Sequence, residues 1–174
     1  MATFTQTYPT DLKYTEWQLI SEFFPSATVG RPQKWEKWQI INGILYVNRS
    51  GCQWRMLPVN FPPWRTVYYY YWRWKGDGLW EQINEVLVKQ VRKKAGRNEQ
   101  PSAAVIDSQS VKTSEGGAER GVDVHKQTPG RKRHLIVDVL GLVLLVVVHS
   151  ASIQDGAGGL NHVAISPLDG TGDL

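Results

Sequence analysis

A single carboxylate within an apolar run is the residue of this sequence whose surroundings most clearly suggest chemistry. Asp107 lies in the segment AAVIDSQSVKT of residues 103–113, which is rich in small and β-branched residues. On a strand, this segment places Val105, Asp107, Gln109 and Val111 on one face. An ionised carboxylate among apolar neighbours is costly unless it is paired or binds a metal ion. Asp107 is therefore a candidate metal ligand. The alternative is a structural Asp that ends the strand and caps the next turn.

Positive charge is concentrated in the first part of the chain. Residues 1–102 carry 14 Lys and Arg against 8 Asp and Glu, whereas residues 103–174 carry 6 against 8. This imbalance favours attraction of the first part to phosphates. For each basic residue the alternative is a solvated surface cation. The candidates for contacts with DNA are Arg31, Lys34, Arg65, Arg73 and Lys75, with Arg131, Lys132 and Arg133 as a second group.

The Asp107 segment is one of several motifs that follow one another in a recognisable order. The series begins with GCQWRMLP and FPPWRTVYYYYWRW, continues with VIDSQSVKT and GRKRHLIVD, and ends with LGL and VVVHSASIQDG. Together these motifs, within residues 8–157, resemble the DDE-type transposases of bacterial insertion sequences.

The resemblance implies DNA transposition, in which DNA strands are cleaved and transferred at the ends of the element. In that family three acidic residues on a ribonuclease H-like fold hold divalent metal, Mg²⁺ or Mn²⁺, and Asp107 matches the first of them. Two such ions can activate the attacking oxygen and stabilise the leaving one. The implied partner is DNA, at the terminal inverted repeats of the element. We also expect the chain to associate with copies of itself, and the cytoplasm is its expected location.

The sequence departs from the family pattern near residue 155. The second Asp and the Glu of the family have no counterpart, and neither Asp138 nor Asp155 matches the second position. Residues 156–174, rich in Gly, are expected to be disordered or to derive from another reading frame. These observations favour a truncated or first-frame transposase that is inactive alone. The alternative is a non-catalytic DNA-binding protein that inhibits transposition.

Composition indicates which elements must position these residues. All Phe, Trp and Tyr residues lie within positions 1–80, so the two parts of the chain are built differently. Because the aromatic residues recur at helical spacing, we expect them in a core rather than as platforms for bases. The single cysteine, Cys52, excludes an internal disulfide. The longest apolar run, residues 139–148, is too short to span a bilayer.

Residues 1–100 are predicted to form a helical DNA-binding domain. A short helix is expected after Thr15, with Gln18 completing a capping box. The next helix spans residues 35–49 and ends at Gly51. A third begins near Pro62 and ends before residue 77, and a fourth spans residues 79–95.

Residues 101–155 are predicted to form the first three strands of an incomplete ribonuclease H-like domain. Two β-branched runs around Gly141 predict a hairpin. If residues 140 and 143 pair, His134 faces His149, and this pair is expected to be exposed surface rather than a metal site. Asp138 is expected to be structural or to face solvent. The sequence therefore predicts an α+β fold, a helical region followed by three strands.

Overall fold

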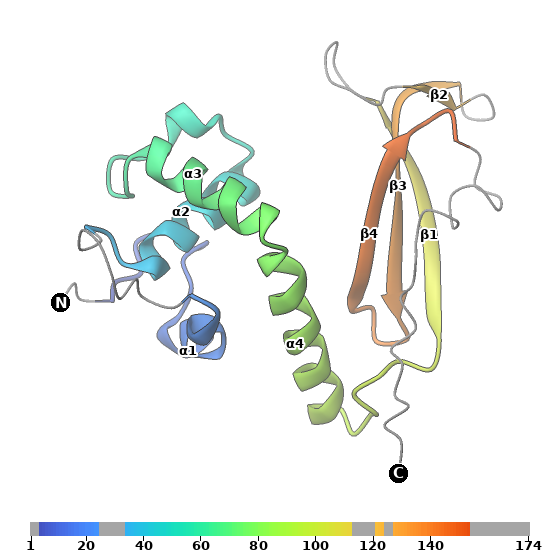
Figure 1. Cartoon of the computed structure of the whole chain (residues 1–174), viewed down its shortest axis with the longest axis horizontal. Coiled ribbons are helices and arrows are strands. Elements are labelled where there is room, and N and C mark those ends of the chain that lie inside the picture. The colour runs from blue at the N-terminus through green and yellow to red at the C-terminus, as the bar shows by residue number, and fades with distance from the viewer. Residues whose placement is uncertain (1–3, 25–33, 113–120, 124–126, 154–174) are drawn as a thin grey trace. The chain divides into compact units, whose positions relative to one another are not determined.

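The computed structural model describes residues 4–24, 34–112, 121–123 and 127–153, and it divides the chain into two compact units (Figure 1). Residues 1–85 form a helical unit, and residues 86–174 form a unit that contains an antiparallel sheet. The predicted α+β class is confirmed. Helix α4 (Leu79–Lys94) begins in the first unit and ends in the second.

The helical unit begins with α1 (Tyr14–Ile20), followed by a 3-10 turn, η1 (Ser21–Phe23). The predicted start of this helix is wrong by two residues. Lys13 is the N-cap, and its backbone N–H donates to Glu16 Oε2 at 2.8 Å. Glu16 therefore caps the helix instead of Gln18, and Thr15 lies inside the first turn.

The next helix is α2 (Lys37–Ser50), and its N-cap is Glu36. The backbone N–H of Glu36 donates to Gln39 Oε1 at 3.0 Å. Gly51 ends it with a φ of 67°, a left-handed conformation that glycine adopts without strain. A 3-10 turn, η2 (Trp54–Met56), then leads to α3 (Trp64–Gly76), whose N-cap is Pro63. The predicted stop of α2 and the predicted place of α3 are both confirmed.

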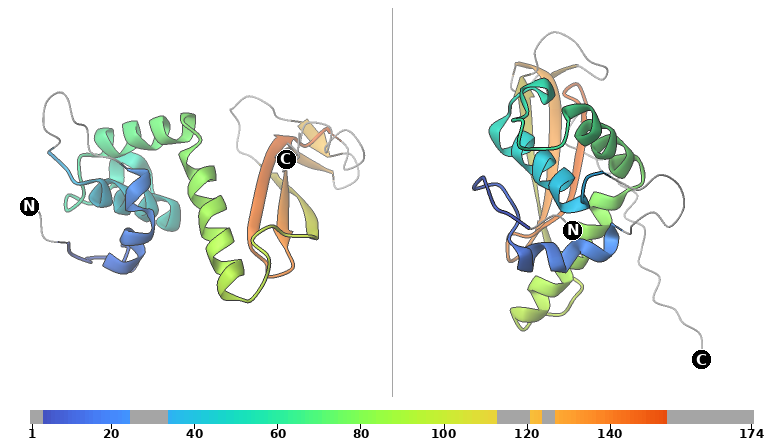
Figure 2. Two further views of the ribbon diagram at one scale, coloured as in Figure 1. Left: turned by 60° about the horizontal axis from the view of Figure 1, so that its bottom comes forward. Right: turned by 90° about the vertical axis from the view of Figure 1, so that its left-hand side faces the viewer.

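The core of the helical unit lies where α2 packs against α3 (Figure 2). Ile40, Ile41 and Ile44 are each 1% exposed, and Val67 of α3 is fully buried. Gly43 permits the close approach, because a Cβ atom there would lie 3.2 Å from both methyl groups of Val67. This packing leaves the opposite side of α3 facing outward.

The second unit contains β1 (Ala104–Lys112), β2 (Gly121–Asp123), β3 (Thr128–Asp138) and β4 (Val143–Ser150). Strand β3 is central and pairs antiparallel with β1 and β4 along most of its length, and with β2 near its start. The three predicted strands correspond to β1, β3 and β4. Strand β2 lies in the segment expected to be a polar excursion, and β3 begins six residues earlier than expected.

The predicted hairpin around Gly141 is confirmed, but its predicted register is wrong. Gly141 has a φ of 77°, and its N–H donates to Asp138 O at 2.9 Å. The register shifts between Ile136 and Val137, so His134 pairs with Val147 and not with His149.

The two histidine rings nevertheless stack, with centroids 4.8 Å apart, because residues two positions apart on a strand share a face. His134 is only 6% exposed. Its expected place on the exposed surface of the hairpin is therefore wrong.

Candidate functional site

Asp107 lies in the middle of β1, opposite Leu135 of β3, and its side chain is exposed. Paired residues of an antiparallel sheet point to the same face, and the pairs Gln109–Arg133 and Val111–Arg131 lie on the Asp107 side. The structure therefore brings three predicted site residues, Asp107, Arg131 and Arg133, onto one face of the sheet.

Gln109 orients one of these cations. The Nε of Arg133 donates to Gln109 Oε1 at 2.9 Å, and Nη2 of the same guanidinium donates to that oxygen as well. Two donors on one acceptor fix the plane of the guanidinium. Gln109 was not a predicted site residue, although its place two residues after Asp107 put it on the same face.

Lys132 is separated from this group. It alternates to the other face of β3, is 3% exposed, and its ammonium donates to Ile153 O at 2.9 Å. Lys132 donates to the backbone of its own chain, so of these three cations only Arg131 and Arg133 share the sheet face of Asp107.

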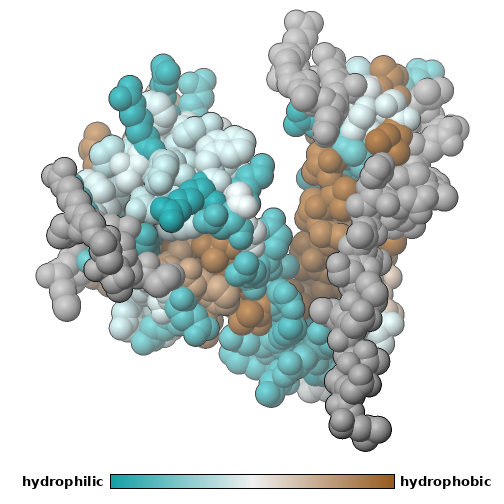
Figure 3. Space-filling view, viewed as in Figure 1, coloured by the Kyte–Doolittle hydropathy of each residue, from teal (hydrophilic) through white to brown (hydrophobic). Residues whose placement is uncertain are grey.

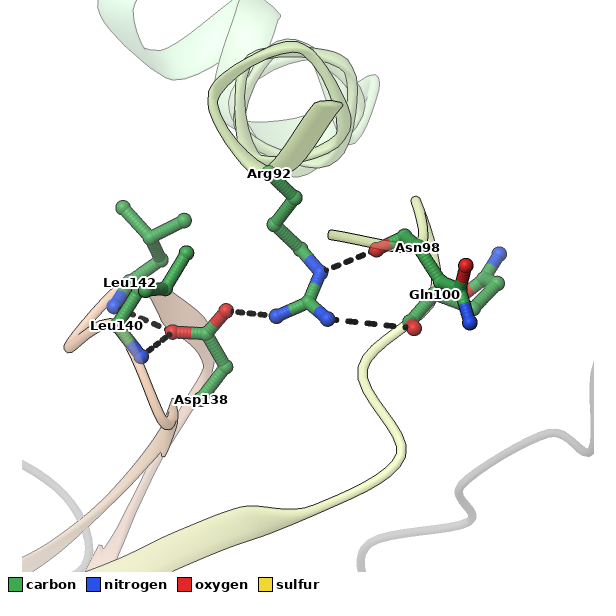
Figure 4. A network of polar contacts seen from close by, with 6 residues as sticks. All are labelled: Arg92, Asn98, Gln100, Asp138, Leu140 and Leu142. Atoms are coloured by element: carbon green, nitrogen blue, oxygen red, sulfur yellow. Dashed lines mark hydrogen bonds and ion pairs between the residues drawn. The ribbon is translucent and has the colours of Figure 1, made fainter. Parts of the chain in front are cut away.

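Asp138 is also on the other face, because it pairs with Ala104. Its Oδ1 accepts hydrogen bonds from Leu140 N at 2.8 Å and Leu142 N at 2.9 Å, and its Oδ2 accepts one from the Arg92 guanidinium (Figure 4). Asp138 is 2% exposed. Its structural role is confirmed, and the solvent-facing alternative is wrong.

The pKa of Asp138 is set by opposing effects. Burial alone would raise it. The hydrogen bonds from Leu142, Arg92 and Leu140 and the charge of Arg92 outweigh burial, and they hold the pKa below its ordinary value. Asp138 is therefore an ionised partner of Arg92.

A divalent metal requires more oxygen ligands than the described strands offer. Asp107 is the one acidic residue on its face of β1, β3 and β4, and no group of three potential ligands occurs among the described residues. Hard cations such as Mg²⁺ are bound by carboxylates together with water. The described residues thus fit one ligand of a metal centre and do not build a complete one.

The predicted basic residues of the helical unit differ in their surroundings. Arg31 lies outside the described residues. Lys34 places its Nζ 5.4 Å from the ring centroid of Trp35. Arg65, Arg73 and Lys75 are exposed on α3, where Arg73 Nε lies 3.9 Å from Asp77 Oδ2. An exposed pair of this kind contributes little to stability.

Arg55 is a basic residue that the sequence reasoning missed. Its Cζ lies 5.6 Å from the ring centroid of Trp64, and Cζ of Arg65 lies 5.5 Å from the same centroid. The alternating Trp and Arg residues of QWRM and PPWR were the available signal.

The aromatic residues divide between core and surface. Trp74 is buried, at 6% exposed, as expected. Tyr69 and Trp72 are 58% and 51% exposed, so their expected place in the core is wrong.

No helix in the described part of the chain is long and apolar enough to cross a membrane.

Two families match successive parts of the chain. Residues 12–84 match "Putative transposase of IS4/5 family (DUF4096)", and residues 98–169 match "Transposase DDE domain". No solved structure matches the chain significantly.

Two curated proteins are similar to it. Uncharacterized protein y4sN of Sinorhizobium fredii (strain NBRC 101917 / NGR234) is 30% identical over 80 residues, which are 45% of this chain and 64% of that protein. The Insertion element IS402 uncharacterized 16.2 kDa protein of Burkholderia cepacia is 29% identical over 122 residues, which are 65% of this chain and 77% of that protein. Both matching families are transposase families and they follow one another in the order that the motifs predict, so the resemblance to the DDE-type transposases of bacterial insertion sequences is confirmed in both parts of the chain.

Proposed function

We propose that this chain is an insertion-sequence transposase that binds the terminal inverted repeats of its element through the helical unit. The observation that carries the proposal is the succession of two transposase families along one chain, with Asp107 exposed on a strand of the second. The first family match covers the part of the chain with excess positive charge, which suits contacts with phosphates.

In the second unit we assign Asp107 as one ligand of the divalent metal that the family uses. When bound, such metal ions activate the attacking oxygen and stabilise the leaving oxygen. Arg131 and Arg133 share the face of Asp107 and suit a DNA phosphate, because a guanidinium can donate two parallel hydrogen bonds. Gln109 would hold Arg133 in the orientation for that contact.

The described residues place only one carboxylate on this face, so we derive no cleavage step from them. The same observation favours a second candidate function. A chain that binds element ends without cleaving them would inhibit transposition by competing with an active transposase.

The proposal is tested with the whole chain and a duplex that carries the terminal inverted repeat of its element. We expect gel-shift binding to that duplex to exceed binding to a scrambled duplex. We also expect affinity to fall steeply with salt, with a log–log slope of about −0.9 for each phosphate neutralised. Equal binding to both duplexes, or binding indifferent to salt, would contradict both candidate functions.

A DNA-cleavage assay distinguishes an active transposase from a chain that only binds the element ends. With Mg²⁺ or Mn²⁺, we expect the chain alone to leave the duplex intact, and Asp107→Asn to leave binding unchanged. Metal-dependent cleavage that Asp107→Asn abolishes would instead show that this chain is a complete enzyme. Cleavage that survives Asp107→Asn would remove Asp107 from the mechanism. Glu22→Gln, which removes an exposed carboxylate of η1 away from the candidate DNA contacts of α3, is the control.

A further inference from the structure

Exposed rings lie between two cations along the outward side of α3. Tyr68 and Tyr69 follow Arg65 by three and four residues, Trp72 follows them by four and three, and Lys75 follows Trp72 by three. These intervals bring the five residues to one side of the helix. Tyr68, Tyr69 and Trp72 are 37%, 58% and 51% exposed. From Arg65 to Lys75 this row extends about 15 Å along the helix.

Neighbouring side chains hold the rings of this row in place. The Trp72 ring has Lys75 Nζ 5.1 Å from its centroid, and the Tyr68 ring meets it edge-on with centroids 6.2 Å apart. Tyr68 in turn packs edge-on against Trp54 of η2, at 5.3 Å. The rings of Tyr68 and Trp72 therefore have fixed neighbours before any ligand arrives, which lowers the entropy cost of binding.

A second cation–ring cluster extends the row at its start. Arg55 and Arg65 both lie against the ring of Trp64, so two guanidinium groups from different elements share one aromatic support. No acidic residue occurs within α3 itself, residues 64–76. The surface thus combines apolar rings with uncompensated positive charge.

This combination fits an anionic, aromatic ligand better than a second copy of the chain. In a two-fold symmetric contact the same surface meets itself, which would bring Arg55, Arg65 and Lys75 of the two copies together. Like charges brought together in an interface are unfavourable. A nucleic-acid strand offers phosphates for the cations and flat bases for the rings.

We propose that the α3 surface, defined as Arg55, Trp64, Arg65, Tyr69, Trp72 and Lys75, binds DNA in which bases are unpaired. Tyr69 and Trp72 stack on bases, and the three cations contact phosphates. Within a duplex the bases stack on each other and cannot reach these rings. The surface therefore favours an element end with an unpaired strand over a flush end. This inference rests on the proposed binding of element ends and names the form of DNA that is bound.

The test compares three probes with the whole chain by fluorescence anisotropy: a flush inverted-repeat duplex, the same duplex with an unpaired overhang, and the single strand. We expect the overhang duplex to bind at least about 5-fold more tightly than the flush duplex. Stacking of one base on a ring changes affinity by about 5-fold to 150-fold.

The variant Tyr69→Leu with Trp72→Leu should lose the preference for the overhang while it still binds the flush duplex. Tyr14→Leu is the matched control, since Tyr14 is 57% exposed on α1 and lies outside the α3 surface. Arg65→Gln should weaken binding to all three probes and flatten the salt slope by about one. Circular dichroism and a thermal melt establish that each variant folds.

Each failure has a distinct meaning. Equal affinity of the wild-type chain for flush and overhang duplexes overturns the inference but leaves the proposed function standing. No binding to any probe overturns the proposed function as well. If the double leucine variant keeps its DNA preference but loses self-association by light scattering, the α3 surface is a protein interface and the inference is wrong.

Discussion

The side chain of Arg92, in α4, forms hydrogen bonds with the β3–β4 hairpin and with the segment that leads into β1. Its guanidinium donates to Asp138 in the hairpin, to Asn98 O at 2.8 Å and to Gln100 O at 3.4 Å (Figure 4). Arg92 is 4% exposed, so its charge is compensated by these acceptors and not by water. The contacts hold the segment that leads into β1, the strand that carries Asp107.

We therefore expect Asp138→Asn to lower the melting temperature of the second unit. The substitution leaves the buried Arg92 cation without its carboxylate. Because the pKa of Asp138 is lowered in the folded state, its contribution is present above its unfolded pKa of about 3.9. That contribution is lost as pH falls through the lower folded value.

Thermal melts of the wild type and the variant at neutral pH, and at successively lower pH, check this expectation. The difference between them should shrink as Asp138 of the wild type becomes protonated. Asp77→Asn removes an exposed ion pair with Arg73 and should change stability by about 1 kcal/mol or less. If Asp138→Asn melts like this control at neutral pH, the buried pair does not stabilise the unit.

At the level of elements, the contact between α2 and α3 depends on the absence of a side chain at Gly43. A methyl group there would lie 3.2 Å from both Val67 methyl groups, and Val67 is fully buried with little room to move. Glycine inside a helix costs about 1 kcal/mol relative to alanine, so its presence indicates a packing requirement.

Gly43→Ala should consequently destabilise the helical unit despite the better helix propensity of alanine. Overpacking costs about 1–3 kcal/mol, which equals or exceeds the propensity gain. Gly76→Ala in the last turn of α3 is the matched control, because outside its own helix backbone and its chain neighbours no atom lies within 4 Å of the added methyl group. Chemical denaturation should show Gly76→Ala unchanged or more stable. A more stable Gly43→Ala would show that α2 and α3 separate easily.

Local signals predicted where elements end, whereas longer-range contacts decided how they fit together. Gly51 and Gly141 indicated a helix stop and a turn, because both positions have a left-handed backbone conformation, which glycine adopts more readily than other residues. The hairpin register escaped prediction, since it depends on the side chain of Asp138 accepting from Leu140 and Leu142 and on an irregularity at Ile136.

In the candidate site, too, local alternation along a strand was predictable, whereas contacts between distant residues were not. Alternation along β1 placed Gln109 with Asp107 correctly, and alternation along β3 would also have removed Lys132 from the group. The Arg92–Asp138 pair joins residues 46 positions apart, and neither residue carries a local sign of its partner. Nor did helical spacing reveal which rings of α3 face outward, because both sides of that helix are aromatic.

At the scale of the whole molecule, the second unit exposes an apolar surface. Apolar side chains gather along its strands (Figure 3). Val146 and Val148 of β4 are 49% and 52% exposed, and Val105 and Ile106 of β1 are 59% and 49% exposed. Strand β1 has no partner along its outer edge among the described strands.

Such strands favour association, because exposed edges and apolar faces can pair with further chains. We expect light scattering to show self-association that increases with protein concentration. Val146→Lys should shift the midpoint of self-association to a protein concentration about tenfold higher. This change corresponds to about 1.4 kcal/mol, a typical gain for burying part of a valine side chain.

Val59→Lys distinguishes the sheet from a general effect of added charge. Val59 is 98% exposed in the helical unit, so the control adds the same cation away from the strands. If both variants reduce association equally, repulsion between net charges explains the effect. If the wild-type chain stays monomeric at all concentrations, the apolar strands do not drive association. A selective effect of Val146→Lys would identify β4 as the contact, and DNA binding by the cations of α3 should then persist in the variant.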